Sequence, residues 1–442
     1  MKKYKIIIDF LKVIGATREA KRYLKLFQKG DPTRFAIIRI GGGVIQESKD
    51  LIAVDLAYLS SINLYPIVIH GGGPQIDNAL KESGIRFKKI DGLRITTRKQ
   101  LPIIKRALDR INAELVSEIQ KFGGFAIGLT EDIFIAEKHP DERLGYAGTV
   151  KKVMLAPIIR AIKAKKIPVV SCLGFDEEGR IYNINADTAA RAVVRAVKPK
   201  KYILITEEGG VRDDNWETIS HINLAEELEP MIKRGVLKDG MLHKVREVDN
   251  LLNELKYNLV VQIAPAGRLL KELFTDKGSG TFIKRGADIQ EYYSYGGIDK
   301  DKLRKLLEKS FGRELKSGYF EKPISFILLD NAYRGTAIVQ PFNSGFYLDK
   351  FCVKDEAQGE GIASDIWNLL IKKCNKLFWR SKPSNPINSW YFENASGCIK
   401  FPKWYFFWIN LTDDEIKPAT DYAINLEESL VLQKLDQPAL QA

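Results

Sequence analysis

The chain has 442 residues, of which 45% are hydrophobic and 28% are charged. This length exceeds one typical domain and the composition is close to the globular average, which excludes disordered, collagen-like and coiled-coil proteins. An excess of 13 basic over acidic residues predicts attraction of anions such as nucleotides or acidic metabolites; because the basic residues are dispersed, we expect no nucleic-acid partner.

The longest apolar runs are too short to cross a membrane. The best candidates, residues 35–40 and 65–70, have the length of a strand, so we expect no membrane association. The apolar stretch within residues 1–13 is interrupted by Asp9 and Lys12 and is followed by no small-residue cleavage site. A cytoplasmic protein is predicted.

The cysteines and histidines form no recognisable cluster. Neither a CxxC pair nor a His/Cys group with metal-ligand spacing is present, so we predict no disulfide framework and no metal site. The cysteines are Cys172, Cys352, Cys374 and Cys398, and the histidines are His70, His139, His221 and His243.

Residues 1–34 are predicted to form an N-terminal arm with one short amphipathic helix at 17–28. From there to residue 286, short Ile/Val-rich runs alternate with longer helical segments, which predicts the α/β class with an open, mostly parallel sheet and helices on both faces. The strand-like runs are 35–40, 66–70, 167–174, 201–206 and 258–264.

The pattern changes after a Tyr- and Gly-rich stretch at 287–301, which we interpret as a junction. Residues 300–442 are predicted to form a smaller α+β domain. Its first part is a helix at 301–311 and an antiparallel meander of three strand-like runs. The runs are 324–329, 334–339 and 345–353, and they precede a helix at 361–376 and a Trp/Tyr-rich helix near 388–396.

Two strand-like runs of the first domain end in triple glycine, at 41–43 and at 71–73. At the carboxyl end of a parallel strand, glycines let backbone N–H groups turn toward a phosphate, and the following helix N-terminus adds a favourable partial charge. Tight turns alone would also explain the glycines. Neither run matches a Walker A or a GxGxxG motif.

Four further segments follow in order, at 91–97, 182–190, 205–210 and 238–245. With the two glycine runs, this set resembles the amino acid kinase superfamily, and specifically N-acetylglutamate kinase. The resemblance implies transfer of the γ-phosphoryl group of ATP, with Mg²⁺, to the side-chain carboxylate of N-acetylglutamate. Such chemistry needs charge neutralisation more than a base, since the carboxylate is already ionised.

The resemblance also implies roles for single residues of the first domain. Lys244 would face the transferring phosphoryl group, Asp187 would orient the cationic side chains, and Arg39 stands where active kinases usually carry lysine. Arginine keeps the charge but spreads it over a planar fork. The expected substrate residues are Arg94, Asn183, Asn185, Gly72 and Gly73, and the expected ATP-binding residues are Gly42 and Gly71.

The second domain contains a Q-x-x-G-x-A pattern between a predicted strand and helix. It resembles the pyrophosphate loop of Gcn-type (GNAT) N-acetyltransferases, in which backbone amides at a helix start bind acetyl-CoA. The pattern is formed by Gln358, Gly359, Gly361 and Ala363.

The segments around this loop resemble the acetyltransferase domain of vertebrate-type N-acetylglutamate synthases and of bifunctional synthase/kinases. In that family Lys350 and Arg380 would bind the two carboxylates of glutamate, and Lys382 stands where a second arginine is common. Asn385 would align the amine, and Tyr391 would protonate the departing thiolate.

A last segment, 272–286, resembles the arginine-binding region of the kinase-like domain in these enzymes, where it acts with the N-terminal arm. The resemblance implies allosteric arginine at Glu272, Gly278 and Gly280. A flexible loop is the alternative. The resemblance also implies a homo-oligomer, either a dimer or a tetramer.

Two functional hypotheses remain after this comparison of motifs. The first is a bifunctional enzyme that acetylates glutamate and phosphorylates the product, regulated by arginine. The second is a synthase whose kinase-like domain serves only as an arginine sensor and oligomerisation module. Arg39, Glu207 and Glu208 favour the second, whereas the segments 183–187 and 240–244 favour the first.

Overall fold

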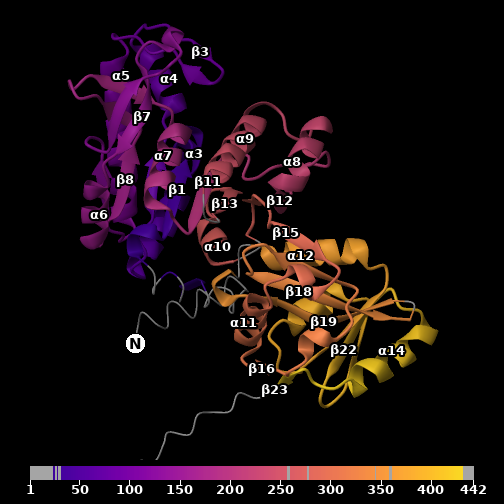
Figure 1. Cartoon of the computed structure of the whole chain (residues 1–442). Helices are drawn as coiled ribbons and strands as arrows, with labels where there is room; N and C mark the ends of the chain where they lie inside the picture. Colours follow the sequence, from indigo (N-terminus) through magenta and orange to yellow (C-terminus); the bar gives the residue numbers. More distant parts are fainter. Residues whose placement is uncertain are drawn as a thin grey trace, which may run out of the picture. The chain divides into compact units, whose positions relative to one another are not determined.

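The computed structural model of the chain describes residues 31–255, 259–275, 278–343, 345–357 and 361–431, together with residues 23, 24 and 27. The chain divides into two compact units, Met1–Arg285 and Gly286–Ala442 (Figure 1). Among the described helices, none is both long and apolar enough to cross a membrane. Most of the predicted arm helix lies outside the described residues, but Tyr23, Leu24 and Phe27 are helical.

In the described part of the first unit, strands rich in Ile and Val form an eight-stranded sheet. The strands are parallel except at the β13–β14 pair, which is antiparallel, so the predicted α/β class is confirmed. In sheet order they are β12 (His221–Asn223), β14 (Thr281–Lys284), β13 (Val260–Ala264), β11 (Lys201–Ile205), β1 (Ala36–Ile40), β2 (Ile67–His70), β8 (Ile167–Ser171) and β5 (Ala126–Leu129).

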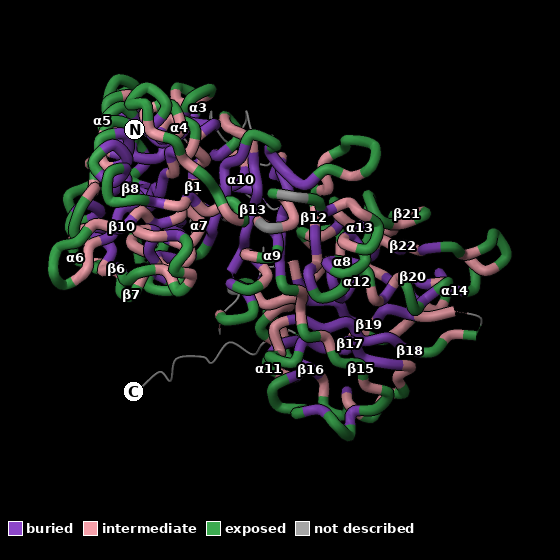
Figure 2. The backbone as a smooth tube through the Cα atoms, turned by 90° about the horizontal axis from the view of Figure 1, so that it is seen from above, coloured by how far each residue is buried: buried purple, intermediate pink, exposed green. Residues whose placement is uncertain are grey.

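Helices cover this sheet, and its central strands are almost fully buried, as the purple tube of Figure 2 shows. Burial on both faces explains why these runs are continuously apolar rather than alternating. Helices α3, α4 and α5 pack on one another, α7 packs on β1 and β2, and α6 packs on β8. The helices are α3 (Gly42–Ser61), α4 (Gly73–Glu82), α5 (Leu101–Lys121), α6 (Leu155–Lys163), α7 (Ala186–Val197), α8 (Leu224–Lys233), α9 (Asp239–Glu254) and α10 (Leu269–Phe274).

A small closed barrel, which the sequence pattern did not predict, lies between β5 and α7 in the chain. Its strands are short and contain Gly and charged residues, so they lack a clear strand signal. They are β6 (Phe134–Lys138), β7 (Ala147–Val153), β9 (Leu173–Phe175) and β10 (Ile181–Ile184). A separate two-stranded hairpin pairs β3 (Lys89–Ile90) with β4 (Leu93–Arg94).

The second unit is built on a seven-stranded sheet, as far as the structure describes it. The stretch 287–301, predicted to be a junction, instead contains strand β15, which pairs with β17 and belongs to this sheet. The predicted meander is confirmed, since β17, β18 and β19 pair antiparallel. The sheet order is β15 (Ile289–Tyr292), β17 (Phe326–Asp330), β18 (Gly335–Phe342), β19 (Gly345–Val353), β20 (Leu377–Ser381), β22 (Tyr405–Ile409) and β21 (Gly397–Lys400).

Two irregularities shape this sheet. A bulge in β19 leaves Asp349 without an opposite residue on β18. Strands β19 and β20 are parallel, and the described pairs between them, Phe346–Leu377 and Tyr347–Phe378, lie only at their beginnings. The helices are α11 (Lys300–Phe311), α12 (Ile362–Lys373), α13 (Asn388–Asn394) and α14 (Asp413–Asn425), and a short β16 (Glu314–Leu315) pairs with β23 (Leu430–Val431).

His70, the last residue of β2, is completely buried beside the second glycine run. Its Nδ1 donates to the carbonyl of Gly71 at 3.1 Å, and the amide of Asn112 lies 3.0 Å from Nε2. The carbonyl can only accept, so the neutral ring carries its proton on Nδ1. Burial lowers the pKa of His70 to about 4.

We predict that His70 makes the first unit sensitive to acid. Because the pKa of His70 is lower in the folded than in the unfolded state, its contribution to the free energy of unfolding is fully present above pH 6.5. As the pH falls toward 4, the free energy of unfolding decreases by about 3 kcal/mol. Urea unfolding of the wild type and of His70→Gln at pH 7 and pH 4.5 measures this. The same loss of stability in both proteins would contradict the assignment.

Candidate functional site

The two triple-glycine runs lie side by side at the carboxyl ends of adjacent strands. Ile40 and His70 are paired in the sheet, and the backbone N–H of Gly71 donates to the Ile40 carbonyl at 3.0 Å. A Cβ on Gly42 would lie 2.8 Å from the backbone nitrogen of Gly73, closer than real contacts allow. Only glycine therefore lets the two loops approach this closely.

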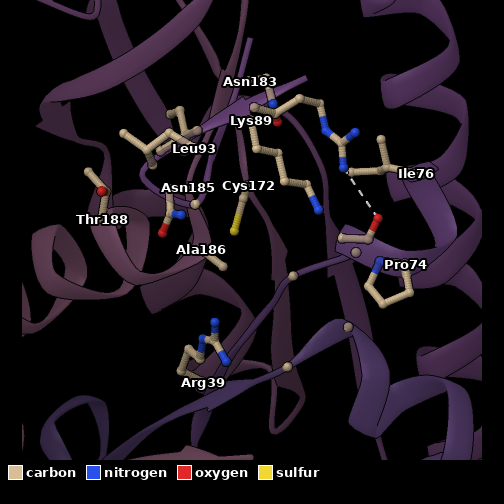
Figure 3. A pocket seen from close by; sticks show the side chains of 18 of the residues that line it. Arg39, Pro74, Ile76, Lys89, Leu93, Cys172, Asn183, Asn185, Ala186 and Thr188 are labelled. Carbon is tan, nitrogen blue, oxygen red and sulfur yellow. Dashed lines mark hydrogen bonds between the residues drawn. The ribbon is translucent and has the colours of Figure 1, made fainter. Parts of the chain in front are cut away.

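A cavity of about 420 Å³ opens between these loops and α7 (Figure 3). It brings together most first-unit residues that the sequence singled out, from five separate segments. In Figure 3, Arg39 lies toward one end and Asn183 and Lys89 toward the other. The predicted residues that line it are Arg39, Gly42, Gly71, Gly72, Gly73, Arg94, Asn183, Asn185 and Lys244.

Asp187 is not one of the residues that line the cavity, but it holds Arg39, which does. The guanidinium of Arg39 makes two contacts with the Asp187 carboxylate, at 2.9 and 3.0 Å. Asn185 accepts from the backbone N–H of Asp187 at 2.8 Å and thereby caps α7. Asn183 donates to the hydroxyl of Thr96 at 3.1 Å.

Two carboxylates also line the cavity, as their positions in the sequence indicated. The Glu208 carboxylate lies 3.2 Å from Nζ of Lys244. Burial acts to raise the pKa of Glu208, but a hydrogen bond from its own backbone N–H and the charge of Lys244 together lower this pKa. The carboxylate of Glu207 lies against Gly43 at the start of α3, where a Cβ would be 1.6 Å from Oε1. Lys244 and the N-terminus of α3, which would each face a phosphate, thus lie next to the carboxylates of Glu208 and Glu207.

At the other end, Arg94 belongs to a group of charges that sequence reasoning only partly identified. Its guanidinium forms an ion pair with Asp77 of α4 and lies 4.8 Å from the ring centroid of Phe87. Lys89, which is opposite Arg94 in the β3–β4 hairpin, also pairs with Asp77 at 2.9 Å and lines the cavity. Lys89 could have been identified as a site residue from the pairing of the hairpin, which places it opposite Arg94.

Arg94 retains hydrogen-bonding capacity toward the cavity. Its side chain is only 6% exposed, and Nη2 donates to the Gly73 carbonyl at 3.3 Å. Nη1 is buried and has no hydrogen-bond partner among the described residues. A buried, unpartnered guanidinium nitrogen at a cavity indicates an anionic ligand.

In the second unit, the predicted acetyl-CoA loop is described in part. Gln358 and Gly359 lie outside the described residues. Gly361 has a positive φ of 77° directly before α12, and Ala363 lies in the first turn of that helix. The glycine is required there because other residues rarely adopt this backbone conformation. The loop thus leads into a helix N-terminus, as the pattern predicted.

The predicted glutamate-binding cations converge near the carboxyl end of β19 and on β20. Lys350 is 5% exposed and lies 2.9 Å from the Asp349 carboxylate. Arg380 and Lys382 both lie over the ring of Trp404, at 4.2 and 3.9 Å from its centroid. Stacking on Trp404 therefore holds these two cations side by side.

Asn385 and Tyr391 lie on the segment that follows β20. The amide of Asn385 donates to the Ser381 hydroxyl at 3.0 Å. Tyr391 is 5% exposed, and its ring lies 5.2 Å from Trp379 and 5.4 Å from Phe407. Burial raises the pKa of Tyr391, so its hydroxyl is protonated at neutral pH.

The predicted arginine segment folds around a buried carboxylate. Glu272 is 1% exposed and accepts from the backbone N–H groups of Ser279 and Gly280, at 2.5 and 3.2 Å. Gly278 has a positive φ, and a Cβ there would lie 2.1 Å from this carboxylate. Burial raises the pKa of Glu272.

The N-terminal arm reaches the same segment. Tyr23 stacks on Phe27, which packs edge-on against Phe274 at the end of α10. Lys201 lies 4.2 Å from the ring centroid of Tyr23 and donates to the carbonyl of Glu272. Tyr23 and Phe27 of the arm are therefore close to the segment that contains Glu272 and Phe274.

The family models match both units. The amino acid kinase family matches residues 34–262, and the N-acetyltransferase of N-acetylglutamate synthase matches residues 284–421. Acetylglutamate kinase of Xanthomonas campestris is 36% identical over 409 residues, which cover 91% of this chain and 96% of the relative. Mitochondrial N-acetylglutamate synthase of Danio rerio is 27% identical over 93% of this chain and 77% of its own length.

Among solved structures, the N-acetylglutamate synthase from Neisseria gonorrhoeae complexed with coenzyme A and N-acetylglutamate has the same fold. It gives a TM-score of 0.64 at 20% identity and covers 94% of this chain and 97% of the other. The chain therefore belongs to the amino acid kinase family, with a kinase domain followed by the N-acetyltransferase domain of N-acetylglutamate synthases.

Proposed function

We propose that this protein acts in arginine biosynthesis and carries out two successive reactions. Its second unit acetylates L-glutamate with acetyl-CoA, and its first unit phosphorylates the N-acetyl-L-glutamate formed. The observation that carries the kinase half is the cavity of about 420 Å³, which joins two glycine loops, Arg39 and Lys244 to Arg94, whose Nη1 has no hydrogen-bond partner among the described residues. The similarity to acetylglutamate kinases over nearly the whole chain supports it.

In the kinase reaction, the side-chain carboxylate of N-acetylglutamate attacks the γ-phosphorus of ATP in line. The bond from this phosphorus to the β,γ-bridging oxygen breaks, and ADP leaves. The backbone of Gly42, Gly71, Gly72 and Gly73 would bind phosphate oxygens, while Lys244 and Arg39 would neutralise the charge that spreads over the transferring group. Mg²⁺ would arrive bound to the phosphates of ATP and would add to this neutralisation of charge.

The other end of the cavity supplies the recognition of substrate. Nη1 of Arg94 would bind the α-carboxylate of N-acetylglutamate, with Asn183 and Asn185 nearby and Lys89 adding a second cation. Asp77 holds both cations and leaves them one net positive charge, which matches a single carboxylate. Asp77 is thus a positioning residue for substrate binding.

We predict that Asp77→Asn raises the KM for N-acetylglutamate about tenfold with little change in kcat, because Arg94 and Lys89 lose their common partner. Initial rates of ADP release against substrate concentration measure this. Asp50→Asn, an exposed site on α3, is the control. An equal fall in kcat at an unchanged KM would show that Asp77 does not act through substrate binding.

In the transferase reaction, the amine of glutamate attacks the acetyl thioester and coenzyme A leaves as the thiol. Acetyl-CoA would lie at the opening between β19 and β20, with its diphosphate at the start of α12 beside Gly361 and Ala363. The raised pKa of Tyr391 suits an acid that protonates the thiolate.

We predict that Tyr391→Phe lowers the kcat of coenzyme A release about 100-fold with a small effect on the KM for glutamate. Phenylalanine fills the same apolar cluster, so the unfolding temperature is the control for folding. Unchanged turnover would remove Tyr391 from the reaction.

A specific observation favours the second candidate, a synthase with a kinase-like sensor domain. Glu208 is paired with Lys244, and the carboxylate of Glu207 lies at the N-terminus of α3. Both carboxylates would therefore repel the phosphates of ATP. Arginine is a proposed effector in either case, at Glu272, Gly278 and Gly280 beside the arm, and a homo-oligomer is proposed for both.

The test of the kinase half is ADP formation that depends on N-acetylglutamate, measured with and without arginine. We predict that Lys244→Ala lowers this rate about 100-fold or more, since the transferring phosphoryl group loses its cation. A wild-type rate no higher than that of the variant would leave the synthase with a sensor domain as the function.

A further inference from the structure

The residues after α14 lie on the cations predicted to bind glutamate. We name residues 426–431 the C-terminal strap. It is fixed to the second unit by the β16–β23 pair and, next to this pair, by a hydrogen bond from the Lys316 backbone N–H to the Ser429 carbonyl at 3.0 Å. Sequence patterns gave no reason to single out this segment.

The strap uses the last free hydrogen-bond donor of Lys350. An ammonium group has three donors, and Nζ of Lys350 has three acceptors around it. They are the Ser429 hydroxyl at 2.7 Å, the Asp349 carboxylate at 2.9 Å and the Asp349 carbonyl at 3.2 Å. A carboxylate of glutamate can reach Lys350 only if one of these acceptors leaves. Of the two side-chain acceptors, the Ser429 hydroxyl is the neutral one.

Arg380 is occupied in the same way. Its Nη1 donates to the carbonyls of Ala423 and Leu426 at 2.7 and 2.6 Å, and Nη2 lies 3.4 Å from the Glu427 carbonyl. Both donors of Nη1 are therefore used by the end of α14 and the beginning of the strap.

Lys382 is paired with a carboxylate of the strap itself. Glu428 lies 2.9 Å from Lys382, 3.1 Å from Lys403 and 3.3 Å from Arg313. Burial acts to raise the pKa of Glu428, but the hydrogen bonds from Lys382 and Lys403 outweigh this effect and lower the pKa to about 2. A glutamate side chain of the protein therefore fills a cation cluster expected to take glutamate as substrate.

We infer that the C-terminal strap occupies the acceptor amino-acid site as an internal substitute, and that glutamate binds by displacing it. The inference rests on the proposed acetyltransferase function. The carboxylate of Glu428 stands in for a substrate carboxylate, while Ser429 and the backbone carbonyls take the remaining donors. Binding of glutamate exchanges these contacts for its own two carboxylates.

Hydrogen–deuterium exchange of the full-length protein tests the displacement without using turnover. With coenzyme A present, saturating L-glutamate should speed amide exchange in residues 426–431 about threefold or more, while β17 stays unchanged. Slower or unchanged exchange in the strap, together with protection elsewhere in the second unit, would overturn the inference. No glutamate-dependent change anywhere and no glutamate-dependent release of coenzyme A would instead remove the proposed acetyltransferase function.

A matched pair of variants tests the competing carboxylate. Glu428→Gln keeps the shape of the side chain and should lower the KM for glutamate about fivefold in the coenzyme A release assay. Glu427→Gln is the control, because that carboxylate is exposed and pairs with Lys316 away from Lys382. A KM for Glu428→Gln that is unchanged or raised, with an active wild type, would show that Glu428 does not compete with substrate.

Discussion

The close approach of two backbone loops is the constraint on which the first unit depends. Strands β1 and β2 are neighbours, each turns into a helix through glycine, and Gly42 and Gly73 come so near that a single methyl group does not fit. This contact brings the starts of α3 and α4 to one cavity. The side chains that complete the site, Arg94 and Lys244 among them, arrive from distant segments but face this same opening.

A second common feature is that cationic side chains of both candidate sites are already paired with carboxylates of the protein. Arg39 is paired with Asp187, Lys244 with Glu208, Arg94 and Lys89 with Asp77, and Lys350 with Asp349. A buried cation without a partner is costly, so these internal carboxylates stabilise the buried cations. An anionic ligand that replaced one of these carboxylates would gain only the difference between two sets of strong contacts.

The sequence predicted those parts of the structure that depend on local pattern. Continuous Ile/Val runs predicted β1, β2, β8, β11 and β13, and the glycine runs predicted the loops that follow the first two. Sequence resemblance then predicted Arg94, Asn183 and Lys244, which line one cavity. The assignment of catalytic roles to these residues stays a prediction.

Other parts could not be predicted, because they depend on contacts between distant residues. The barrel strands β9 and β10 have three and four residues and no clear alternation. Asp77 is recognised only once the β3–β4 hairpin is seen beside α4. Glu428 meets Lys382 across 46 residues, and no local pattern marks that pair.

The bulge at Asp349 has a consequence for the whole of β19. In a regular strand, side chains three residues apart face opposite sides of the sheet. Leu348 and Phe351 nevertheless enter the same hydrophobic cluster, because the extra residue between them shifts the phase of the strand. The same shift lets the consecutive residues Asp349 and Lys350 meet as an ion pair. One residue thus decides which side chains of β19 face each side of the sheet. Relatives that keep both the apolar cluster and the ion pair must therefore keep the length of this strand.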